Sequence, residues 1–348
     1  MKTAGDQAAG RRVARARRAV LAALAEIGEA AGAARVSDVT SARGIELQPR
    51  AIRYHLAAMD REGMTRLVSR RRGRVLTERG RDELARGDVL AKLGFVAARM
   101  DDLAYRMCFD PASGTGTVIA NVAWLDAADL TRALALMEPA FLAGLGMGDR
   151  IAVAHEGDRI ACHVVPAGRV ALGTICSVTL NGILLKAGIP VASRFGGLLE
   201  MRGGRPLRFV ELIEYRGTTI DPLDVFMRAG LTSVSACART GDGLVGASLR
   251  EAPSAAMPDL HRIARRLRAL SLPALLTTGR PDQPLFQIPV TGGHAALLVM
   301  GGLNPVAVLR EAGMQVDLGS LAGLEDIRRF RPVGEARLGH RRESPLID

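Results

Sequence analysis

Cysteine is scarce in this sequence of 348 residues, which contains four cysteines at scattered positions. They are Cys108, Cys162, Cys176 and Cys237, and no two of them form a C-x-x-C pair. A disulfide framework or a cysteine-rich zinc site needs closely and regularly spaced cysteines. The spacing therefore excludes both kinds of site and fits a reducing, cytoplasmic setting.

Long apolar segments are also missing from the sequence. No apolar run approaches the ~18–20 residues that cross a bilayer as a helix. The arginine-rich start is not followed by the apolar segment of a secretory signal peptide. We therefore expect neither a membrane-spanning segment nor a membrane partner.

Recognisable catalytic and metal-binding motifs are absent as well. The six histidines form neither an H-x-x-x-H nor an H-E-x-x-H pair, and the sequence has no G-x-S-x-G motif and no P-loop. We therefore expect no catalytic residues, no metal and no bound cofactor. An enzyme with Cys176 or Ser177 as its nucleophile remains an alternative, although the sequence shows no base to support either residue.

Positive charge, by contrast, is abundant and unevenly distributed. The formal net charge is +11, and the hydrophobic fraction of 48% is typical of a globular protein. Residues 1–93 contain 20 Lys and Arg against 11 Asp and Glu, whereas residues 94–348 contain 27 against 25. This asymmetry indicates a polyanion-binding module at the N-terminus. A basic surface that is merely solvated is the alternative.

A winged-helix pattern begins with an amphipathic helix whose apolar residues are Ile52, Leu56 and Met59. Their spacing is typical of a helix with one face in a hydrophobic core. Two short strands are expected next, over residues 65–68 and 74–76, on either side of an arginine-rich tip. A helix followed by a basic hairpin is the arrangement with which winged helix-turn-helix domains bind DNA.

We expect the recognition helix to enter the major groove and the hairpin to lie along the phosphates. The residues assigned to DNA contact are polar and basic side chains of these two elements, Gln48, Arg50, Arg53, Tyr54, Arg70, Arg71, Arg72 and Arg74. The expected partner is double-stranded DNA with an inverted-repeat operator, bound by a homodimer. Further helices are expected over residues 17–31, 36–42 and 81–86, after a mobile basic arm over residues 1–16.

Two groups of segments resemble the NrpR family. Residues 47–56, LQPRAIRYHL, with residues 59–63, MDREG, and residues 72–80, RGRVLTERG, resemble its winged-helix head. Residues 173–191, GTICSVTLNGILLKAGIPV, and residues 193–200, SRFGGLLE, are similar to the signature of its regulatory domain. Together the head and the body cover about residues 17–330.

The resemblance implies a transcriptional repressor of nitrogen-assimilation genes. It implies a winged-helix DNA-binding domain over residues 17–93, here called the head. A regulatory domain that binds an effector and dimerises, here called the body, would cover residues 94–330, and a tail would cover residues 331–348. It also implies 2-oxoglutarate as the small-molecule effector and a PII-type signalling protein as a further partner. A body that mainly binds a partner protein is the alternative.

The body shows a faint internal duplication, offset by about 125 positions. Residues 114–120, GTGTVIA, align with residues 241–247, GDGLVGA, and each is followed by a helix-like stretch. Strands are expected at short, β-branched-rich runs, residues 118–123, 151–154, 170–172, 209–213, 244–249 and 296–300. A chance match in a chain rich in glycine and alanine is the alternative.

The expected fold class is therefore α+β. A winged helix-turn-helix would be followed by an α/β body made of two similar halves, at about residues 94–215 and 216–330. A ligand cleft is expected where the two halves meet.

An anionic effector needs hydroxyls, cations and backbone N–H groups, ideally at a helix N-terminus. Residues 173–177 end an expected strand and begin a helix, whereas residues 193–197 are expected to place an arginine in a glycine-rich turn. The expected effector site takes its members from these two segments, Thr174, Cys176, Ser177, Ser193, Arg194, Gly196 and Gly197. The alternative is that the hydroxyls merely cap the helix and that the arginine forms an ion pair within the protein.

Overall fold

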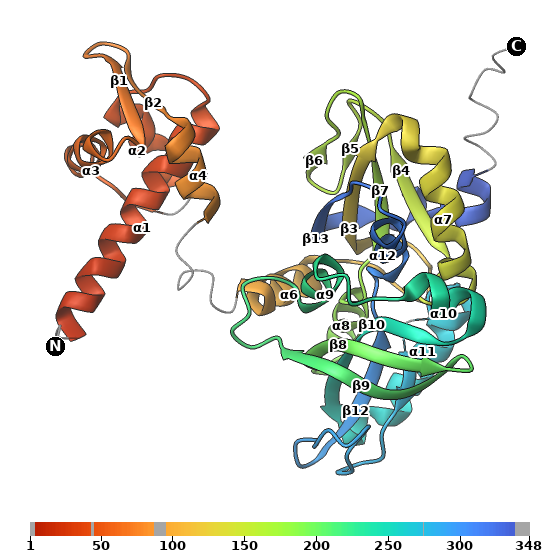
Figure 1. Cartoon of the computed structure of the whole chain (residues 1–348). Helices are drawn as coiled ribbons and strands as arrows, with labels where there is room; N and C mark the ends of the chain where they lie inside the picture. Colours follow the sequence, from red (N-terminus) through yellow and green to blue (C-terminus); the bar gives the residue numbers. More distant parts are fainter. Residues whose placement is uncertain (1–3, 43–44, 87–94, 274, 338–348) are drawn as a thin grey trace, which may run out of the picture. The chain divides into compact units, whose positions relative to one another are not determined.

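The structure is a computed structural model that describes residues 4–42, 45–86, 95–273 and 275–337. The chain divides into two compact units, Met1–Leu93 and Gly94–Asp348, which are described separately (Figure 1). The boundary predicted between head and body lies within residues 87–94, outside the described residues.

The head has the winged-helix order of three helices, a two-stranded antiparallel hairpin and a fourth helix. Its elements are α1 (Ala4–Ile27), α2 (Ala33–Ala42), α3 (Pro49–Arg61), β1 (Thr65–Ser69), β2 (Gly73–Leu76) and α4 (Glu78–Arg86). Apolar residues of α1, α2 and α3 form one core cluster, and Leu76 of β2 joins it. The fold class predicted for the head is confirmed.

The first helix is longer than predicted, because α1 already begins at Ala4. The basic arm expected over residues 1–16 is therefore helical from residue 4 onward, while residues 1–3 lie outside the described part. Alanine, arginine and glutamine have high helix propensity, so this composition favours continuation of the helix over an irregular arm.

Tight backbone approaches position the wing. A Cβ atom on Gly73 would lie 2.1 Å from the carbonyl oxygen of Ala31, and one on Gly80 would lie 2.1 Å from that of Met64. The backbones of Arg74 and Ala31 exchange two hydrogen bonds, of 3.0 and 2.9 Å. The hairpin is therefore fixed against the loop between α1 and α2.

The body contains two five-stranded sheets with strand orders β13-β3-β7-β4-β14 and β11-β12-β10-β8-β9. Its first half consists of α6 (Phe95–Arg106), β3 (Thr117–Asp126), η1 (Ala127–Asp129), α7 (Leu130–Leu142), β4 (Arg150–Ala154), β5 (Arg159–Ile160), β6 (His163–Val164), β7 (Arg169–Ile175), α8 (Thr179–Lys186), β8 (Ala192–Arg202) and β9 (Arg205–Glu214). Its second half consists of α9 (Pro222–Arg228), α10 (Val234–Thr240), β10 (Gly243–Pro253), η2 (Ser254–Ala256), α11 (Met257–Ala269), β11 (Leu275–Thr278), β12 (His294–Met300), α12 (Asn304–Glu311), β13 (Asp317–Asp326), η3 (Ile327–Arg329) and β14 (Arg331–Pro332).

The two halves repeat the same order of elements. The series β3, α7, β4, β7, α8, β8 corresponds to the series β10, α11, β11, β12, α12, β13. All six strands predicted in the body are present, and the two similar halves are confirmed. The last strand of each series pairs with the first strand of the other, since β8 pairs with β10 and β13 pairs with β3. The halves are therefore interlocked by exchanged strands.

Both hydrophobic clusters of the body combine residues from the two halves. Along β12, Leu297 and Val299 belong to one cluster, whereas Leu298 and Met300 belong to the other. Since successive side chains of a strand point to opposite faces, both faces of this sheet are covered at β12.

The C-terminal boundary of the body differs from the prediction. The tail expected from residue 331 begins with β14, which pairs with β4, and continues into a helical turn up to residue 337. Val333 is only 2% exposed, so hydrophobic burial extends the body beyond residue 330. Within the described ranges, none of the helices combines the length and the apolar character that crossing a bilayer requires.

Candidate nucleic-acid interface and effector site

One face of α3 presents polar and basic side chains to solvent. Gln48, Arg50, Arg53 and Tyr54 are exposed, and Tyr54 keeps 73% of its surface accessible. The opposite face is buried in the core of the head through Ile52, Leu56 and Met59. Proline at the first helical position suits the start of α3, where an N–H would lack an intrahelical acceptor.

The hairpin carries a second exposed basic surface at its tip. Arg70, Arg71 and Arg72 are exposed, and among the described residues none of their guanidinium groups has a hydrogen bond or ion pair. The Ser69 hydroxyl accepts a 3.0 Å hydrogen bond from the backbone N–H of Arg72, which shapes the turn. Arg66 on β1 is exposed as well, a basic residue of the wing that the sequence analysis did not assign.

Arg74 has a different environment from the arginines at the tip. Its Nε donates to Asp60 Oδ2 at 2.6 Å, and the other oxygen of Asp60 accepts from the Thr65 hydroxyl at 2.6 Å. Both members of the ion pair are about three-quarters buried. Arg74 therefore attaches the wing to α3, an environment that the sequence pattern did not indicate.

His55 lies within α3 but faces the interior of the head. It is 8% exposed, and burial together with the nearby Arg17 cation lowers the pKa of its imidazole. Arg17 itself forms an ion pair with Glu62. His55 is thus a neutral packing residue at physiological pH and adds no charge to the basic face.

In the body, the predicted effector residues Thr174, Cys176 and Ser177 are buried where the two halves meet. The Thr174 hydroxyl donates to the Gly302 carbonyl at 3.0 Å and accepts from Asn121 at 3.4 Å. A Cβ on Gly302 would lie 2.4 Å from the Ile175 carbonyl oxygen. The loop before α8 and the loop before α12 are therefore in direct backbone contact.

Arg250, which the sequence analysis missed, organises this junction. Its side chain is 1% exposed and donates to four acceptors. These are Ser248 Oγ at 3.1 Å, the Ser177 carbonyl at 2.9 Å, Ser177 Oγ at 2.8 Å and Asn181 Oδ1 at 2.5 Å. None of the four is a carboxylate, so a buried guanidinium fixes the start of α8 through neutral groups alone. Burial lowers the pKa of Arg250.

Three ionisable groups near Arg250 are also shifted by burial. Burial raises the pKa of the Cys176 thiol to about 12 and that of the Asp221 carboxyl to about 6, and it raises the pKa of Tyr215 well above its usual range. Cys176 is therefore a protonated thiol at neutral pH, which disfavours it as a nucleophile. Asp221 is also the N-cap of α9, where its carboxylate accepts from the Leu223 N–H.

The second predicted segment is a strand rather than a glycine-rich turn, because residues 193–197 lie within β8. The Arg194 guanidinium donates to Glu251 Oε1 at 2.7 Å and to the Thr291 hydroxyl at 3.1 Å. Glu251 is 3% exposed in its side chain, whereas Arg194 is 32% exposed. Arg194 is therefore engaged by a carboxylate of the protein itself.

The remaining members of the predicted site are held by protein groups. Ser193 Oγ accepts from the Asn181 amide at 3.0 Å, which joins it to the Arg250 cluster. A Cβ on Gly196 would lie 2.8 Å from the Pro222 side chain, and one on Gly197 would lie 2.5 Å from the Glu211 carbonyl oxygen. These two glycines permit close packing against β9 and α9. Lys186 is the last residue of α8.

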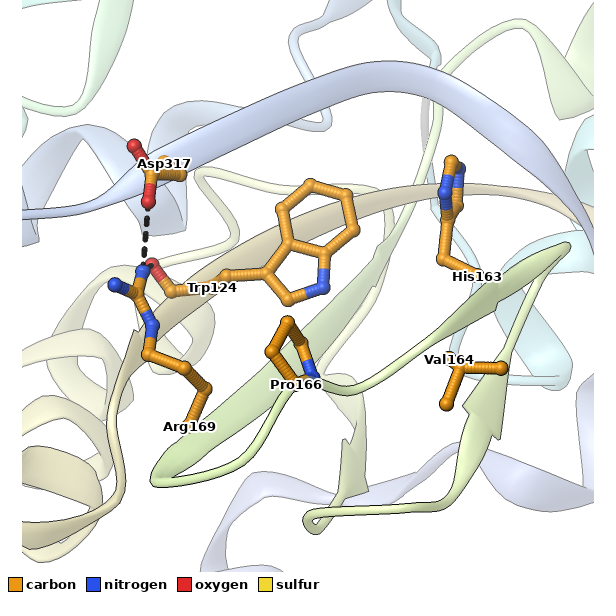
Figure 2. Close-up of a pocket in the computed structure, with 6 residues that line it drawn as sticks. All are labelled: Trp124, His163, Val164, Pro166, Arg169 and Asp317. Carbon is orange, nitrogen blue, oxygen red and sulfur yellow. Dashed lines mark hydrogen bonds and ion pairs between the residues drawn. The ribbon is translucent and has the colours of Figure 1, made fainter. Parts of the chain in front are cut away.

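A cavity of about 400 Å³ lies beside Trp124, the single tryptophan of the sequence. Figure 2 shows the indole between His163 and the Arg169–Asp317 ion pair, with Pro166 beneath it. The rings of Trp124 and His163 meet edge to face with centroids 5.3 Å apart. Arg169 Nη2 donates to Asp317 Oδ2 at 2.7 Å, so both charges at this end of the cavity are paired.

A second cavity of about 400 Å³ shares Trp124 and His163 with the first and extends to Asp221 and Arg99. Its wall includes residues 319–322, where β13 loses register with β3. The seven predicted effector residues line neither of these cavities, whose walls consist of described residues. The structure thus buries Thr174, Cys176 and Ser177 at the junction of the halves, whereas both cavities beside Trp124 are lined by other residues.

The geometry defines a class of protein in which a winged-helix head with a basic face is joined to an α/β body of two interlocked halves. Comparisons with known proteins agree with this class. Residues 93–332 match the model of the NrpR regulatory domains NRD1 and 2, and residues 18–84 match that of the Ribonuclease R winged-helix domain.

Named relatives cover most of the chain. The Global nitrogen regulator NrpRI of Methanosarcina mazei is 32% identical over 302 residues, 87% of this chain and 93% of the relative. The Global nitrogen regulator NrpR of Methanococcus maripaludis is 27% identical over 88% of this chain, which spans 53% of that relative's length. A crystal structure of a nitrogen repressor-like protein from Methanococcus jannaschii matches with a TM-score of 0.57 and 26% identity, covering 68% of this chain and 97% of that chain.

The chain belongs to the NrpR family.

Proposed function

We propose that this protein is a sequence-specific DNA-binding transcription regulator, a repressor of nitrogen-assimilation genes, that binds an inverted-repeat operator as a homodimer. The observation that carries the proposal is the pair of exposed basic surfaces on α3 and on the tip of the hairpin. Relatives named as global nitrogen regulators support the choice of genes. The protein is a regulator and not an enzyme in this proposal.

The two basic surfaces have different roles in DNA binding. Arg50, Arg53 and Tyr54 on α3 face the major groove, with Gln48 at the start of the helix, whereas the arginines at the tip of the hairpin contact phosphates. Contacts to base edges carry sequence information, and contacts to phosphates supply affinity that depends on salt. Arg74 contributes by holding the wing on α3.

Fluorescence anisotropy with a labelled operator tests this division. Replacing Arg71 and Arg72 by alanine should weaken binding to operator and random duplex alike and should lower the slope of log K against log salt by about 2. Arg216→Ala, an exposed arginine of the body, is the matched control. Equal affinity of the wild type for operator and random duplex would refute sequence-specific binding.

The body is proposed to bind 2-oxoglutarate as its effector. The support is a buried polar cluster at the meeting point of the two halves, in which Ser177 and Ser193 are joined through Arg250 and Asn181. Thr174 is bonded to the adjacent Gly302 carbonyl, and the partly exposed Arg194 lies one residue along β8 from Ser193. A ligand carboxylate would have to compete with Glu251 for Arg194. The measurement is calorimetry with 2-oxoglutarate on the wild type, Arg194→Ala and Glu251→Gln. Unchanged affinity in Arg194→Ala would remove this residue from the effector site.

Effector binding would favour a conformation of the body that spaces the two heads of a dimer wrongly for the operator, a shift between two populations. A body that mainly binds a PII-type signalling protein is the second candidate. A thermal-shift screen with central-carbon acids distinguishes the two, because only a direct sensor is stabilised by one of the acids in the absence of a partner protein.

A further inference from the structure

The internal repeat predicts that corresponding helices of the two halves pack in the same way. In the repeat, α7 corresponds to α11 and α8 corresponds to α12. Because α7 packs closely against α12, the symmetry calls for equally close packing of α11 against α8. The structure breaks the symmetry here, since no comparable packing joins α11 to α8.

On the packed side, a helix of the chain itself fills the space. The short helix α10 packs against both α7 and α12. Its N-terminus is held by Glu311, the last residue of α12, whose two carboxylate oxygens accept from the N–H groups of Val234 and Ser235 at 2.8 Å each. Val234 and Cys237 of α10 are buried in the core.

On the other side, the corresponding helix is α6, which precedes β3 as α10 precedes β10. It packs against α8 but not comparably against α11, and a cavity of about 540 Å³ lies between α8 and α11. Its walls are the loop after α6, the last turn of α8 and one face of α11. Apolar side chains supply much of the lining, Phe109, Pro111, Ala112, Ile183, Ala187 and Ile263. This volume lies within the range of about 300–1,000 Å³ that is typical of small-molecule sites.

The charge at the repeat-related position is inverted between the two sides. Lys186, the last residue of α8, stands where α12 has Glu311, and both residues are followed by Ala-Gly. Lys186 lines the cavity, and among the described residues its ammonium has no hydrogen bond or ion pair. Glu311 accepts hydrogen bonds from the N–H groups of α10. The ammonium of Lys186 can only donate, so Lys186 is suited to a negatively charged acceptor.

The other charged side chains that line the cavity already have partners within the protein, and these interactions differ in strength. Arg266 donates to the backbone carbonyls of Pro111 and Ala112 at 2.9 and 2.8 Å and thereby fixes one wall. Arg262 forms an exposed ion pair with Asp259, which contributes little and can be exchanged for a ligand. The Asp110 carboxylate accepts from N–H groups of its own turn.

We propose that this cavity is a binding site for an amphipathic organic acid, whose carboxylate pairs with Lys186 and Arg262 and whose apolar body lies against Phe109, Ile183 and Ile263. The ligand would lie between α8 and α11, beside the end of α6. The site is separate from the Arg250 cluster and from the cavities beside Trp124, and it does not depend on the proposed function.

Calorimetry on the full chain with decanoate tests the proposal, with decan-1-ol as the uncharged probe and 2-oxoglutarate as the acid without an apolar body. The wild type should bind decanoate saturably and at least tenfold more tightly than either other probe. Lys186→Met should weaken decanoate binding at least tenfold, as should Ile263→Asp, whereas Arg216→Met should leave it unchanged.

The reactivity of Cys108 gives a second, independent measure of ligand binding, because its exposed thiol lines the cavity. Hydrogen bonds with Thr117 lower the pKa of this thiol, which favours the reactive thiolate. In a Cys162→Ser background, decanoate should slow the reaction of Cys108 with a disulfide reagent, and Ile263→Asp should abolish this protection. The proposal is overturned by the absence of saturable decanoate binding, by equal binding in the wild type and both cavity variants, or by unprotected Cys108 at saturating decanoate.

Discussion

Arg250 shows how a single side chain connects the two halves of the body. It lies on β10, in the second half, and holds the carbonyl and hydroxyl of Ser177 and the amide oxygen of Asn181, which belong to the first half. A buried hydrogen bond to a charged donor contributes more than a neutral one, and an orphaned acceptor costs its desolvation. The position of the loop before α8 therefore depends on one guanidinium.

Replacing Arg250 by methionine should lower the free energy of unfolding by about 2–4 kcal/mol, because Ser177 and Asn181 lose their donors inside the body. Arg106→Met is the matched control, since this arginine pairs with Asp102 on α6 and both side chains are exposed, by 58% and 48%. Chemical denaturation of both variants checks the prediction. A loss in Arg250→Met no larger than in Arg106→Met would show that the cluster does not stabilise the junction.

The carboxyl of Asp221 makes stability depend on pH in a defined direction. Its pKa is raised by burial from 3.8 to about 6, so between about pH 4 and pH 6 the folded state binds a proton that the unfolded state does not bind. Stability should therefore fall as the pH rises from 4 to 6, by up to about 3 kcal/mol from this group.

The variant Asp221→Asn isolates the contribution of Asp221. Asparagine is as good an N-cap as aspartate, so the cap of α9 is retained while the titrating group is removed. Denaturation curves at several pH values should show a steeper loss of stability toward pH 6 in the wild type than in the variant. Glu214→Gln, an exposed carboxylate at the end of β9, should leave the pH profile of the wild type unchanged.

At the scale of elements, the contact between the loops before α8 and α12 joins the two halves. Gly302 is required there, because a Cβ would lie 2.4 Å from the Ile175 carbonyl oxygen and 3.0 Å from the Cys176 Cα. These are backbone atoms that cannot move aside without displacing β7. The two loops are therefore closely coupled.

Gly302→Ala should destabilise the protein by more than about 2 kcal/mol, the range expected for overpacking against a rigid neighbour. Gly292→Ala, where a Cβ meets nothing within 4 Å, is the control and should change stability by less than about 0.5 kcal/mol. Thermal unfolding of the two variants gives the comparison. Similar melting temperatures would contradict the close contact between the loops.

The sequence predicts the helices and strands that have a strong local pattern. It does not predict strands that form only because they pair with a distant strand. Strands such as β3 and β12 are rich in β-branched and other apolar residues, and both were predicted. The strands β8 and β13 contain SRFGGLLE and DLGSLAGLE, in which glycines suggest turns. They are strands because each pairs with the first strand of the other half, a tertiary effect that overrides local propensity.

The site residues also divide into those that a local sequence pattern predicts and those that depend on distant contacts. The helical period correctly indicated which face of α3 is exposed. The partners of Arg74 and Arg250 could not be predicted, because Asp60 lies 14 positions from Arg74 and Ser177 lies 73 from Arg250. Contacts between residues this distant in sequence depend on the folded topology and leave no periodic signal.

At the scale of the whole molecule, we propose that the head binds DNA and that the body controls this binding. The head has the exposed arginines of α3 and of the hairpin tip, whereas the body has the buried cluster and the cavities. Both units must be present in one chain for an effector to change operator affinity, since linkage requires that the two sites share a conformational equilibrium.

The recognition helix gives the most specific prediction at this scale. Arg53→Ala should cost about 1–3 kcal/mol of operator affinity and relax the sequence preference, if the guanidinium makes a bidentate contact to a base. Binding to random duplex should change much less. Competition titrations of the full chain with operator and random duplex measure both quantities together.

The most direct test of the central claim is selection of bound fragments from the native genome by the 348-residue chain at physiological salt. The recovered fragments should share an inverted repeat, and Arg53→Ala should reduce their enrichment at least severalfold. Fragments recovered in proportion to their abundance in the genome would contradict this claim.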